Sequence, residues 1–234
     1  MLTTYGFVLN KKEVREFDRE YCFFTKKYGK IHLIAKAVRK PLSKLSAQLE
    51  PPSLIEIVFV PISDKGLITT ALVKKSFLKT HKNLNKFRVY TRLSDIINSF
   101  TDFKQPDSLV WNLFNLSINN LEQWNSKIVE LNFLAKFIKI LGFGPNISTC
   151  INCQKKFKDQ KKIYFDNHKW GFCCEDCGKN MKPVSWQLFK SVDVLTNLDF
   201  AEIVKRELNE PIELRYNDIY TFLKNYIKYI KKYF

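Results

Sequence analysis

Five short apolar runs, separated by polar turn-like sequence, dominate the chain before residue 75. They occupy residues 4–9, 21–25, 31–36, 54–60 and 67–73. Runs of this length that are rich in β-branched and aromatic residues predict strands when turn residues bound them. Five consecutive short strands predict a small closed β-barrel, and the OB-fold is a five-stranded barrel that binds nucleic acid.

Beyond residue 79 the apolar positions recur at helical spacing. We expect helices from Thr80 to about residue 100, from Ser108 to about residue 124, and from Ser126 to residue 141, with Gly142 after the third. Two further helices are predicted at residues 185–198 and 218–234. Two stripes are predicted to be core, one of Ile128, Leu131, Leu134, Ile138 and Leu141, the other of Ile219, Leu223, Tyr226, Ile227 and Ile230.

Four cysteines between these helical regions form two pairs with identical spacing. Cys150 and Cys153 make one Cys-x2-Cys turn, and Cys174 and Cys177 make the other. Two such turns direct four thiolates to one point and complete a tetrahedral shell that suits zinc. A full shell leaves no position for water or substrate, so we expect one structural Zn²⁺ per chain and no metal-assisted catalysis.

Other roles for the cysteines are less favoured by their context. Disulfides need an oxidising compartment, whereas the start of the chain lacks a signal- or transit-peptide pattern, so we expect a cytoplasmic protein. Cys173 can replace Cys174 through a Cys-x3-Cys spacing, and His168 can replace one thiolate, but the spacing favours Cys174. Cys22 lies in an apolar run and is predicted to be a core residue.

The predicted fold class is therefore α+β, with an N-terminal OB-fold β-barrel followed by an α-helical domain that carries an inserted four-cysteine zinc finger. We place the barrel domain at residues 1–78 and the first part of the helical domain at 79–149. The zinc-binding segment spans 150–180, and the C-terminal part of the helical domain spans 181–234. Because no Gly/Ser-rich linker separates these parts, they are expected to pack together.

The charge balance indicates a polyanionic partner. The chain of 234 residues has 39 Lys and Arg against 23 Asp and Glu, a formal net charge of +16. Nucleic acid is the first candidate, and a membrane is not expected because no apolar stretch of about twenty residues exists. Between the third and fourth strands, a proline-containing segment carries Lys36, Arg39, Lys40 and Lys44, which predicts either a DNA-binding loop or an ordinary solvated loop.

Aromatic residues of the barrel offer a second kind of nucleic-acid contact. Tyr5, Phe7 and Phe24 can stack on bases, although aromatic residues of small barrels are more often core. The patterns of common active sites are absent from the sequence, among them a phosphate-binding Gly-rich loop, a nucleophile elbow and a zinc-protease helix. The three histidines carry no sign of pairing with a nucleophile, so we predict that the protein is not an enzyme.

The order of several motifs resembles the RecO family of bacterial recombination mediator proteins. These motifs are KAVRK at residues 36–40, LEP at 49–51, LGFGP at 141–145, the entry into the first cysteine pair, and WGFCC at 170–174. The resemblance spans nearly the whole chain, and the last motif supports Cys174 over Cys173 as ligand.

This resemblance implies a DNA repair and recombination mediator that binds single- and double-stranded DNA and anneals complementary strands. It also implies binding to the acidic tail of single-strand-binding protein, and joint action with RecR to help load RecA. The family's DNA contacts correspond to Lys36, Arg39, Lys40 and Lys44. The chain departs from the family pattern at Ala37, where glycine is usual, and at Leu42, where a basic residue is common.

The predicted partner surface lies on the third helix. Lys136 and Lys139 share one helix face, and Phe133 and Phe137 lie close to it, so together they are predicted to hold an acidic tail with an apolar end. Two other function classes stay open: an RNA-binding zinc-ribbon protein, such as a ribosome or tRNA factor, and a zinc enzyme whose site the motifs do not reveal.

Overall fold

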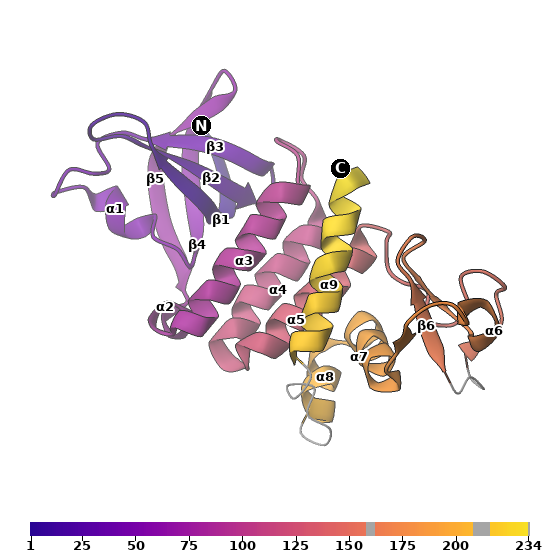
Figure 1. The fold of residues 1–234 in the computed structure, drawn as a ribbon. Helices are drawn as coiled ribbons and strands as arrows, with labels where there is room; N and C mark the ends of the chain where they lie inside the picture. Colours follow the sequence, from indigo (N-terminus) through magenta and orange to yellow (C-terminus); the bar gives the residue numbers. More distant parts are fainter. Residues whose placement is uncertain (158–161, 208–215, 234) are drawn as a thin grey trace. The chain divides into compact units, whose positions relative to one another are not determined.

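The structure, a computed structural model, describes residues 1–157, 162–207 and 216–233 (Figure 1). The chain divides into two compact units, Met1–Ser126 and Lys127–Phe234. This division by packing does not test the predicted boundary after residue 78, which follows the change from strands to helices. Among the described residues, no helix is long and apolar enough to cross a membrane.

The N-terminal unit begins with a closed barrel whose strands are hydrogen-bonded in the order β1-β2-β3-β5-β4. The strands are β1 (Leu2–Glu13), β2 (Arg19–Thr25), β3 (Gly29–Ala35), β4 (Ser53–Ile62) and β5 (Lys65–Ser76). Strand β1 pairs with both β2 and β4, which closes the barrel. Of these five strands, only β3 and β5 pair in parallel, through Leu33–Gly66 and Ile34–Leu67. The prediction of an OB-like barrel followed by helices is confirmed.

Alternation of apolar and polar positions places the barrel core. In β4, Ile55 and Ile57 are fully buried, whereas Glu56 and Val58, which alternate with them, are partly exposed. This period of two turns every second side chain into the barrel. Ile55 and Ile57 belong to one buried cluster with Phe23 of β2 and Leu33 of β3.

Three helices follow the last barrel strand in the N-terminal unit: α2 (Leu78–Lys82), α3 (Leu84–Phe100) and α4 (Ser108–Gln123). The predicted single helix from Thr80 is wrong at its start. The side chain of Asn83 accepts hydrogen bonds from the N–H groups of Asn85 and Lys86, at 3.0 and 3.1 Å, and so begins a separate helix. Asp107, one residue before the predicted cap Ser108, caps α4 in the same way.

An aromatic cluster joins the barrel to these helices. The ring centroid of Phe7 lies 5.3 Å from that of Phe114, and that of Phe24 lies 5.7 Å from that of Trp111. Phe7 and Phe24 are both fully buried, so they are core residues and cannot stack on bases. Tyr5 remains 39% exposed.

The segment after β3 is a mostly exposed loop over residues 36–43, as predicted, and a short helix follows it. Turns lead from Lys36 to a short helix, α1 (Lys44–Gln48), which the proline-containing sequence did not predict. The backbone of Ala37 is left-handed, with φ of 53°, and its N–H donates to Oδ1 of Asp18 at 2.8 Å. This hydrogen bond ties the basic segment to the connection between β1 and β2.

The C-terminal unit combines helices with a small sheet. Its helices are α5 (Ser126–Ile140), α6 (Glu175–Gly178), α7 (Trp186–Asn197), α8 (Phe200–Glu207), α9 (Tyr216–Ile230) and the 3-10 helix η3 (Lys231–Tyr233). The sheet has the order β7-β6-β8, with β6 (Ile163–Asp166), β7 (Gly171–Cys173) and β8 (Pro183–Val184). Ser185 caps α7, since its Oγ accepts from the N–H of Leu188 at 3.1 Å. Phe234, the end of the last predicted helix, lies outside the described residues.

The two predicted apolar stripes differ in outcome. All five stripe residues of α9 are buried, as expected. Helix α5 is buried on almost every side, because Glu130, Asn132, Phe133 and Phe137 are buried together with four of its five stripe residues. The fifth, Leu141, follows the helix and is half-buried. The polar pair is hydrogen-bonded, Glu130 to the hydroxyl of Tyr216 at 2.6 Å and Asn132 to a backbone carbonyl at 3.5 Å. One amphipathic stripe therefore understated the burial of this helix.

Candidate nucleic-acid interface and metal centre

The four paired cysteines come together at one point of the C-terminal unit. The sulfur atoms of Cys150, Cys153, Cys174 and Cys177 all lie within 4.8 Å of one another. A tetrahedral site with Zn–S bonds of about 2.3 Å separates its sulfurs by about 3.8 Å. The Cys153 and Cys174 sulfurs, 3.5 Å apart, are close to that separation. The four cysteines can therefore hold a metal ion.

The first cysteine pair is shaped by its own backbone. The N–H of Gln154 donates to the carbonyl of Cys150 at 2.9 Å, and the N–H of Asn152 donates to the Cys150 sulfur at 3.4 Å. Gln154 itself has φ of 62°, which closes the turn. The N–H of Ile151 donates to the carbonyl of Phe172 in β7 at 2.9 Å, so this turn is attached to the strand that leads into the second pair.

The second pair brackets the short helix α6. Cys174 directly precedes α6 and Cys177 lies within it, and the N–H of Gly178 donates to the carbonyl of Cys174 at 2.9 Å. A Cβ atom at Gly178 would lie 2.4 Å from the ring of Tyr164 in β6. Any larger residue would therefore push this pair away from the small sheet.

The thiols of the cluster differ strongly in acidity. Burial disfavours the Cys150 thiolate, but hydrogen bonds from the N–H groups of Cys153, Cys174 and Asn152 lower the pKa of Cys150 to about 6. Hydrogen bonds with the sulfurs of Cys153 and Cys174 raise the pKa of Cys177 to about 12. Four thiolates side by side repel one another, and a divalent cation compensates that repulsion.

The alternative ligands lie outside the cluster. Among the described residues, the group contains neither Cys173 nor His168. Cys173 is fully buried, and burial raises the pKa of its thiol to about 11. His168 is exposed in the turn between β6 and β7. Cys22 is a buried core residue of the barrel, as predicted, and burial raises its pKa to about 11.

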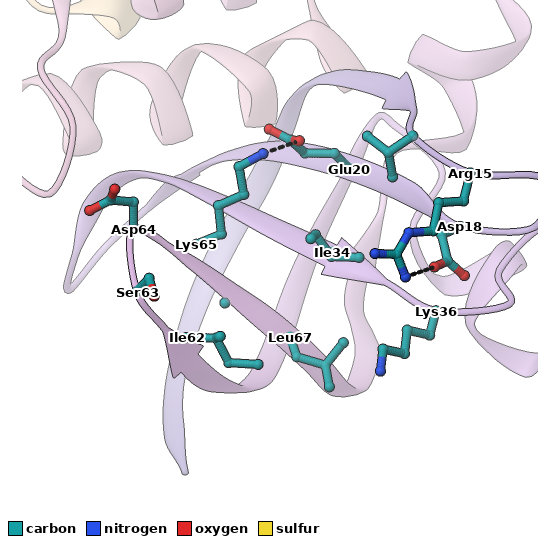
Figure 2. A pocket seen from close by; sticks show the side chains of 12 residues that line it. Arg15, Asp18, Glu20, Ile34, Lys36, Ile62, Ser63, Asp64, Lys65 and Leu67 are labelled. Atoms are coloured by element: carbon teal, nitrogen blue, oxygen red, sulfur yellow. Dashed lines mark hydrogen bonds and ion pairs between the residues drawn. The ribbon is translucent and has the colours of Figure 1, made fainter.

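A groove of about 540 Å³ runs along one face of the barrel (Figure 2). Its walls come from the β1–β2 connection, β2, β3 and the β4–β5 turn. Figure 2 shows Arg15, Asp18 and Lys36 at one end and Ser63, Asp64 and Lys65 at the other, with Ile34 and Leu67 between them. In OB-folds, this combination of strands and loops is the face that binds oligonucleotides.

Carboxylates hold the cations of this groove in place. One oxygen of Glu20 accepts a hydrogen bond from Lys65 at 2.7 Å, and the other contacts Nδ1 of His32. The hydrogen bond from Lys65 lowers the pKa of the Glu20 carboxyl, although burial opposes that shift. At the other end, Arg15 lies 3.9 Å from Asp18. The groove is thus an ordered array of both charge signs.

The structure distributes the four predicted DNA-binding residues over neighbouring positions. Lys36 lines the groove. Arg39 reaches the end of β1, where it pairs with a carboxylate oxygen of Glu13 at 3.2 Å. The Lys40 ammonium lies 5.3 Å from the ring centroid of Phe17 in the β1–β2 connection. Lys44 is exposed at the start of α1.

Two groove cations were missed in the sequence. Arg15 and Lys65 each stand among acidic or apolar residues, so neither belongs to a basic run. Their only signal was position, since they follow the first strand and precede the fifth strand, where the loops of an OB-fold flank its binding face.

The predicted partner residues lie on α5, but the aromatic part of that prediction is wrong. Phe133 and Phe137 are fully buried and stack on each other with ring centroids 5.5 Å apart. Lys136 is half-buried, and burial together with the charge of Lys139 lowers its pKa. Lys139 is exposed and donates to the side chain of Asn197 at 3.1 Å. Any apolar contact with a partner must come from other residues.

Comparison with known families covers almost the entire chain. The family described as "Recombination protein O N terminal" matches residues 1–77, which include the barrel. The family described as "Recombination protein O C terminal" matches residues 81–229, which include the remaining helices and the cysteine pairs.

The matches to curated relatives cover most of this chain and most of each relative. A protein of Caldicellulosiruptor bescii named DNA repair protein RecO is 27% identical over 232 residues, which cover 98% of this chain and 93% of that protein. The protein of the same name from Acetivibrio thermocellus is 26% identical and covers 90% of this chain and 85% of its own length. The one from Desulforamulus reducens is 22% identical, with 95% and 86% covered.

Proposed function

Because the chain belongs to the RecO family, we propose that it is a non-enzymatic mediator of DNA repair and recombination, which binds single- and double-stranded DNA and anneals complementary strands. The observation that carries this proposal is the barrel groove, because Arg15, Lys36 and Lys65 line it on the face that OB-folds use for oligonucleotides. The family models that match residues 1–77 and 81–229 confirm the family resemblance drawn from the order of motifs.

In this proposal, the phosphate backbone follows the groove and the basic segment beside it. Lys36, Arg39, Lys40 and Lys44 contact phosphates, and Arg15 and Lys65 extend the track. Such contacts depend on charge, so binding is nearly independent of base sequence and falls steeply with salt. Arg39 must exchange Glu13 for a phosphate, so it contributes less affinity than its charge alone suggests.

The net charge of +16 supports annealing and the recruitment of acidic partners. Neutralisation of two strands at one protein reduces their mutual repulsion. We propose that Lys136 and Lys139 bind the acidic tail of single-strand-binding protein in the cytoplasm. We also propose that the protein works with RecR to help load RecA.

The metal proposed for the cysteine cluster is Zn²⁺, one per chain, bound by Cys150, Cys153, Cys174 and Cys177. Four thiolates fill a tetrahedral shell, so zinc here holds two turns of the chain together and leaves no open position for a reaction. A donor set of four thiolates favours zinc over magnesium or calcium, which prefer oxygen ligands.

The groove is tested by the affinity for labelled single-stranded DNA as a function of salt, measured by fluorescence anisotropy. Each phosphate contact contributes about 0.7 to the log–log salt slope, so the double variant Lys36→Ala, Lys40→Ala should flatten that slope by about 1.4. The matched control is Lys79→Ala, Lys82→Ala, which removes two exposed charges from α2. An equal change in both double variants would reject the groove, and tighter binding to a matched RNA would favour the RNA-binding alternative.

The partner is tested with a labelled peptide that ends in acidic and apolar residues. Binding at low salt that Lys136→Glu weakens, while Lys190→Glu on α7 leaves it unchanged, supports the proposed location. Binding that neither substitution changes would keep the partner and move its site. A complete lack of binding at low salt would remove the partner.

A further inference from the structure

A second, smaller pocket opens next to the groove. It has a volume of about 280 Å³ and shares the β4–β5 turn, residues 63–66, with the groove. Ile31, Leu33 and Phe59 line it from the barrel core, and Tyr28, Pro61 and Pro106 line it nearer the surface. Of the residues that line this pocket, only Lys65 belongs to the phosphate track proposed above, so the apolar interior of the pocket needs a separate explanation.

The pocket lies where the barrel is least tightly paired. Strands β3 and β5 form only two residue pairs. In one of these pairs, Gly66 of β5 lies opposite Leu33 of β3. A Cβ atom at Gly66 would lie 2.6 Å from Cδ2 of Leu33 and 2.8 Å from Cδ2 of Phe59. The absence of a side chain lets these two apolar groups pack against the backbone of the turn, where they line the pocket.

The lining combines an apolar interior with a cationic rim. Tyr28 packs edge-on against Phe59, with ring centroids 5.6 Å apart and an interplanar angle of 89°. Lys27, Lys65 and Lys104 line the same pocket. Lys104 faces the exposed carboxylate of Asp64 at 3.9 Å, a loose surface pair that a ligand can displace. The complementary ligand is a flat apolar group with negative charge on either side.

A nucleobase with its flanking phosphates has this chemistry. An acidic peptide with an apolar end shares it, but the position of the pocket favours the base, because a strand in the groove enters the pocket by crossing a single turn. Pockets for drug-sized ligands begin at roughly 300 Å³, so this one suits a single base better than a longer segment.

We propose that this pocket binds one unstacked base of a single-stranded nucleic acid whose phosphates lie in the groove. The inference rests on the proposed function of the groove and names the part of the ligand that the second pocket takes. A duplex cannot offer such a base without unpairing and unstacking it. The pocket therefore makes the barrel prefer single strands over duplex DNA.

The first test uses the wild-type protein and two labelled oligonucleotides of equal length, oligothymidylate and the same strand with abasic positions in its central part. Stacking of one base on protein groups contributes about 1–3 kcal/mol, so the base-bearing strand should bind at least about fivefold more tightly. The salt slopes of the two strands should be equal, because both carry the same phosphates.

The second test fills the pocket. Pro61→Trp places a large side chain at the pocket wall, and Thr70→Trp places the same residue at an exposed position of β5 as the matched control. The Pro61→Trp protein should bind the base-bearing and abasic strands equally and keep the wild-type salt slope. The Thr70→Trp protein should keep the wild-type preference for the base-bearing strand.

The outcomes separate this inference from the proposed function. Equal, salt-dependent affinity of the wild-type protein for both strands would overturn the base pocket and leave the groove intact. No binding of either strand would overturn the proposed function itself. An acidic peptide ending in phenylalanine that binds wild-type protein but not Pro61→Trp, with no effect of base removal, would assign the pocket to a protein partner and reject the base.

Discussion

The barrel and the cysteine segment, defined as residues 146–184, are both small β-structures, but different forces hold them. The barrel has ladders of up to ten residue pairs, as between β4 and β5, and an interior of fully buried residues such as Phe23, Leu33 and Ile57. The strands of the cysteine segment have only four, three and two residues. Ladders that short provide little cooperative stability.

The two regions differ in whether their folding requires a bound metal ion. The barrel buries enough apolar surface to hold its loops, including those of the groove, without a ligand. In the cysteine segment, Cys150 and Cys174 are themselves buried members of the local cluster, and Cys173 lies beside them. Removal of the metal should therefore disrupt one region and spare the other.

The largest expected effect comes from a broken metal shell. Cys174→Ser should abolish tight zinc binding and unfold the cysteine segment, because structural zinc contributes about 10 kcal/mol of apparent binding energy at neutral pH. Elemental analysis should fall from one zinc per chain to none, and limited proteolysis should begin within residues 146–184. Single-strand DNA affinity should stay within about twofold, because the groove belongs to the barrel.

Cys173→Ala is the matched control, since the thiol of Cys173 is buried next to the cluster. It should keep its zinc and resist proteolysis like the wild-type protein. Loss of zinc in the Cys173 variant and retention in the Cys174 variant would reverse the ligand assignment. Elemental analysis that finds no metal in wild-type protein prepared without chelator would refute the zinc proposal.

The reverse experiment weakens the barrel and leaves the metal in place. Phe24 is fully buried against Trp111 and Phe114, so Phe24→Ala should lower the free energy of unfolding of the N-terminal unit by about 3–5 kcal/mol. Urea denaturation should detect this loss, while the zinc content stays at one per chain. Tyr5→Ala, at a 39% exposed position of β1, is the control and should cost far less. Loss of zinc in the Phe24 variant would show that the two regions are coupled.

Local patterns in the sequence were enough to predict the elements that depend on neighbouring residues. The apolar run at residues 54–60 predicted strand β4, and the spacing of Cys150, Cys153, Cys174 and Cys177 predicted which thiols approach one another. Both rest on geometry that a few consecutive residues determine. The family resemblance could be found for the same reason, since it was carried by the order of such local motifs.

Features set by distant residues escaped the sequence. Thr80 and Asn83 are both capping residues, and packing decides between them, because Thr80 is fully buried. The contacts of Glu20 with His32 and Lys65 join three strands, so they require the barrel register. The burial of Phe133 required knowledge of what surrounds α5. An apolar stripe indicates one buried face and contains no information about the others.

An intermediate effect should appear at the charged centre of the groove. Glu20→Gln should lower the free energy of unfolding of the N-terminal unit by about 1 kcal/mol at neutral pH, because it weakens the contacts with Lys65 and His32. The folded-state pKa of Glu20 lies below its ordinary value of 4.5, so this stability is present above about pH 4.5. It is lost as the pH falls through the folded pKa.

Denaturation curves of the two proteins at several pH values measure this difference. They should differ at pH 6–7 and converge in more acidic solution, where the wild-type carboxyl is protonated as well. Glu56→Gln in β4 is the control, since Glu56 pairs with Lys74 at a more exposed position. A difference that grows as the pH falls would contradict the assigned direction of the pKa shift.

The smallest expected effect tests how the basic segment is held to the barrel. Ala37 has φ of 53°, a left-handed conformation that costs an alanine about 1 kcal/mol and a glycine almost nothing. Ala37→Gly should therefore raise the free energy of unfolding of the N-terminal unit by up to about 1 kcal/mol, reduced by the greater freedom of glycine in the unfolded chain. Ala47→Gly, at an exposed position of helix α1, should instead lower it by roughly 1 kcal/mol, because glycine is a poor helix former. Urea denaturation of both variants gives the two signs. If both substitutions destabilise the protein equally, the backbone at Ala37 is not left-handed in solution, and the hydrogen bond from its N–H to Asp18 does not fix the start of the basic segment.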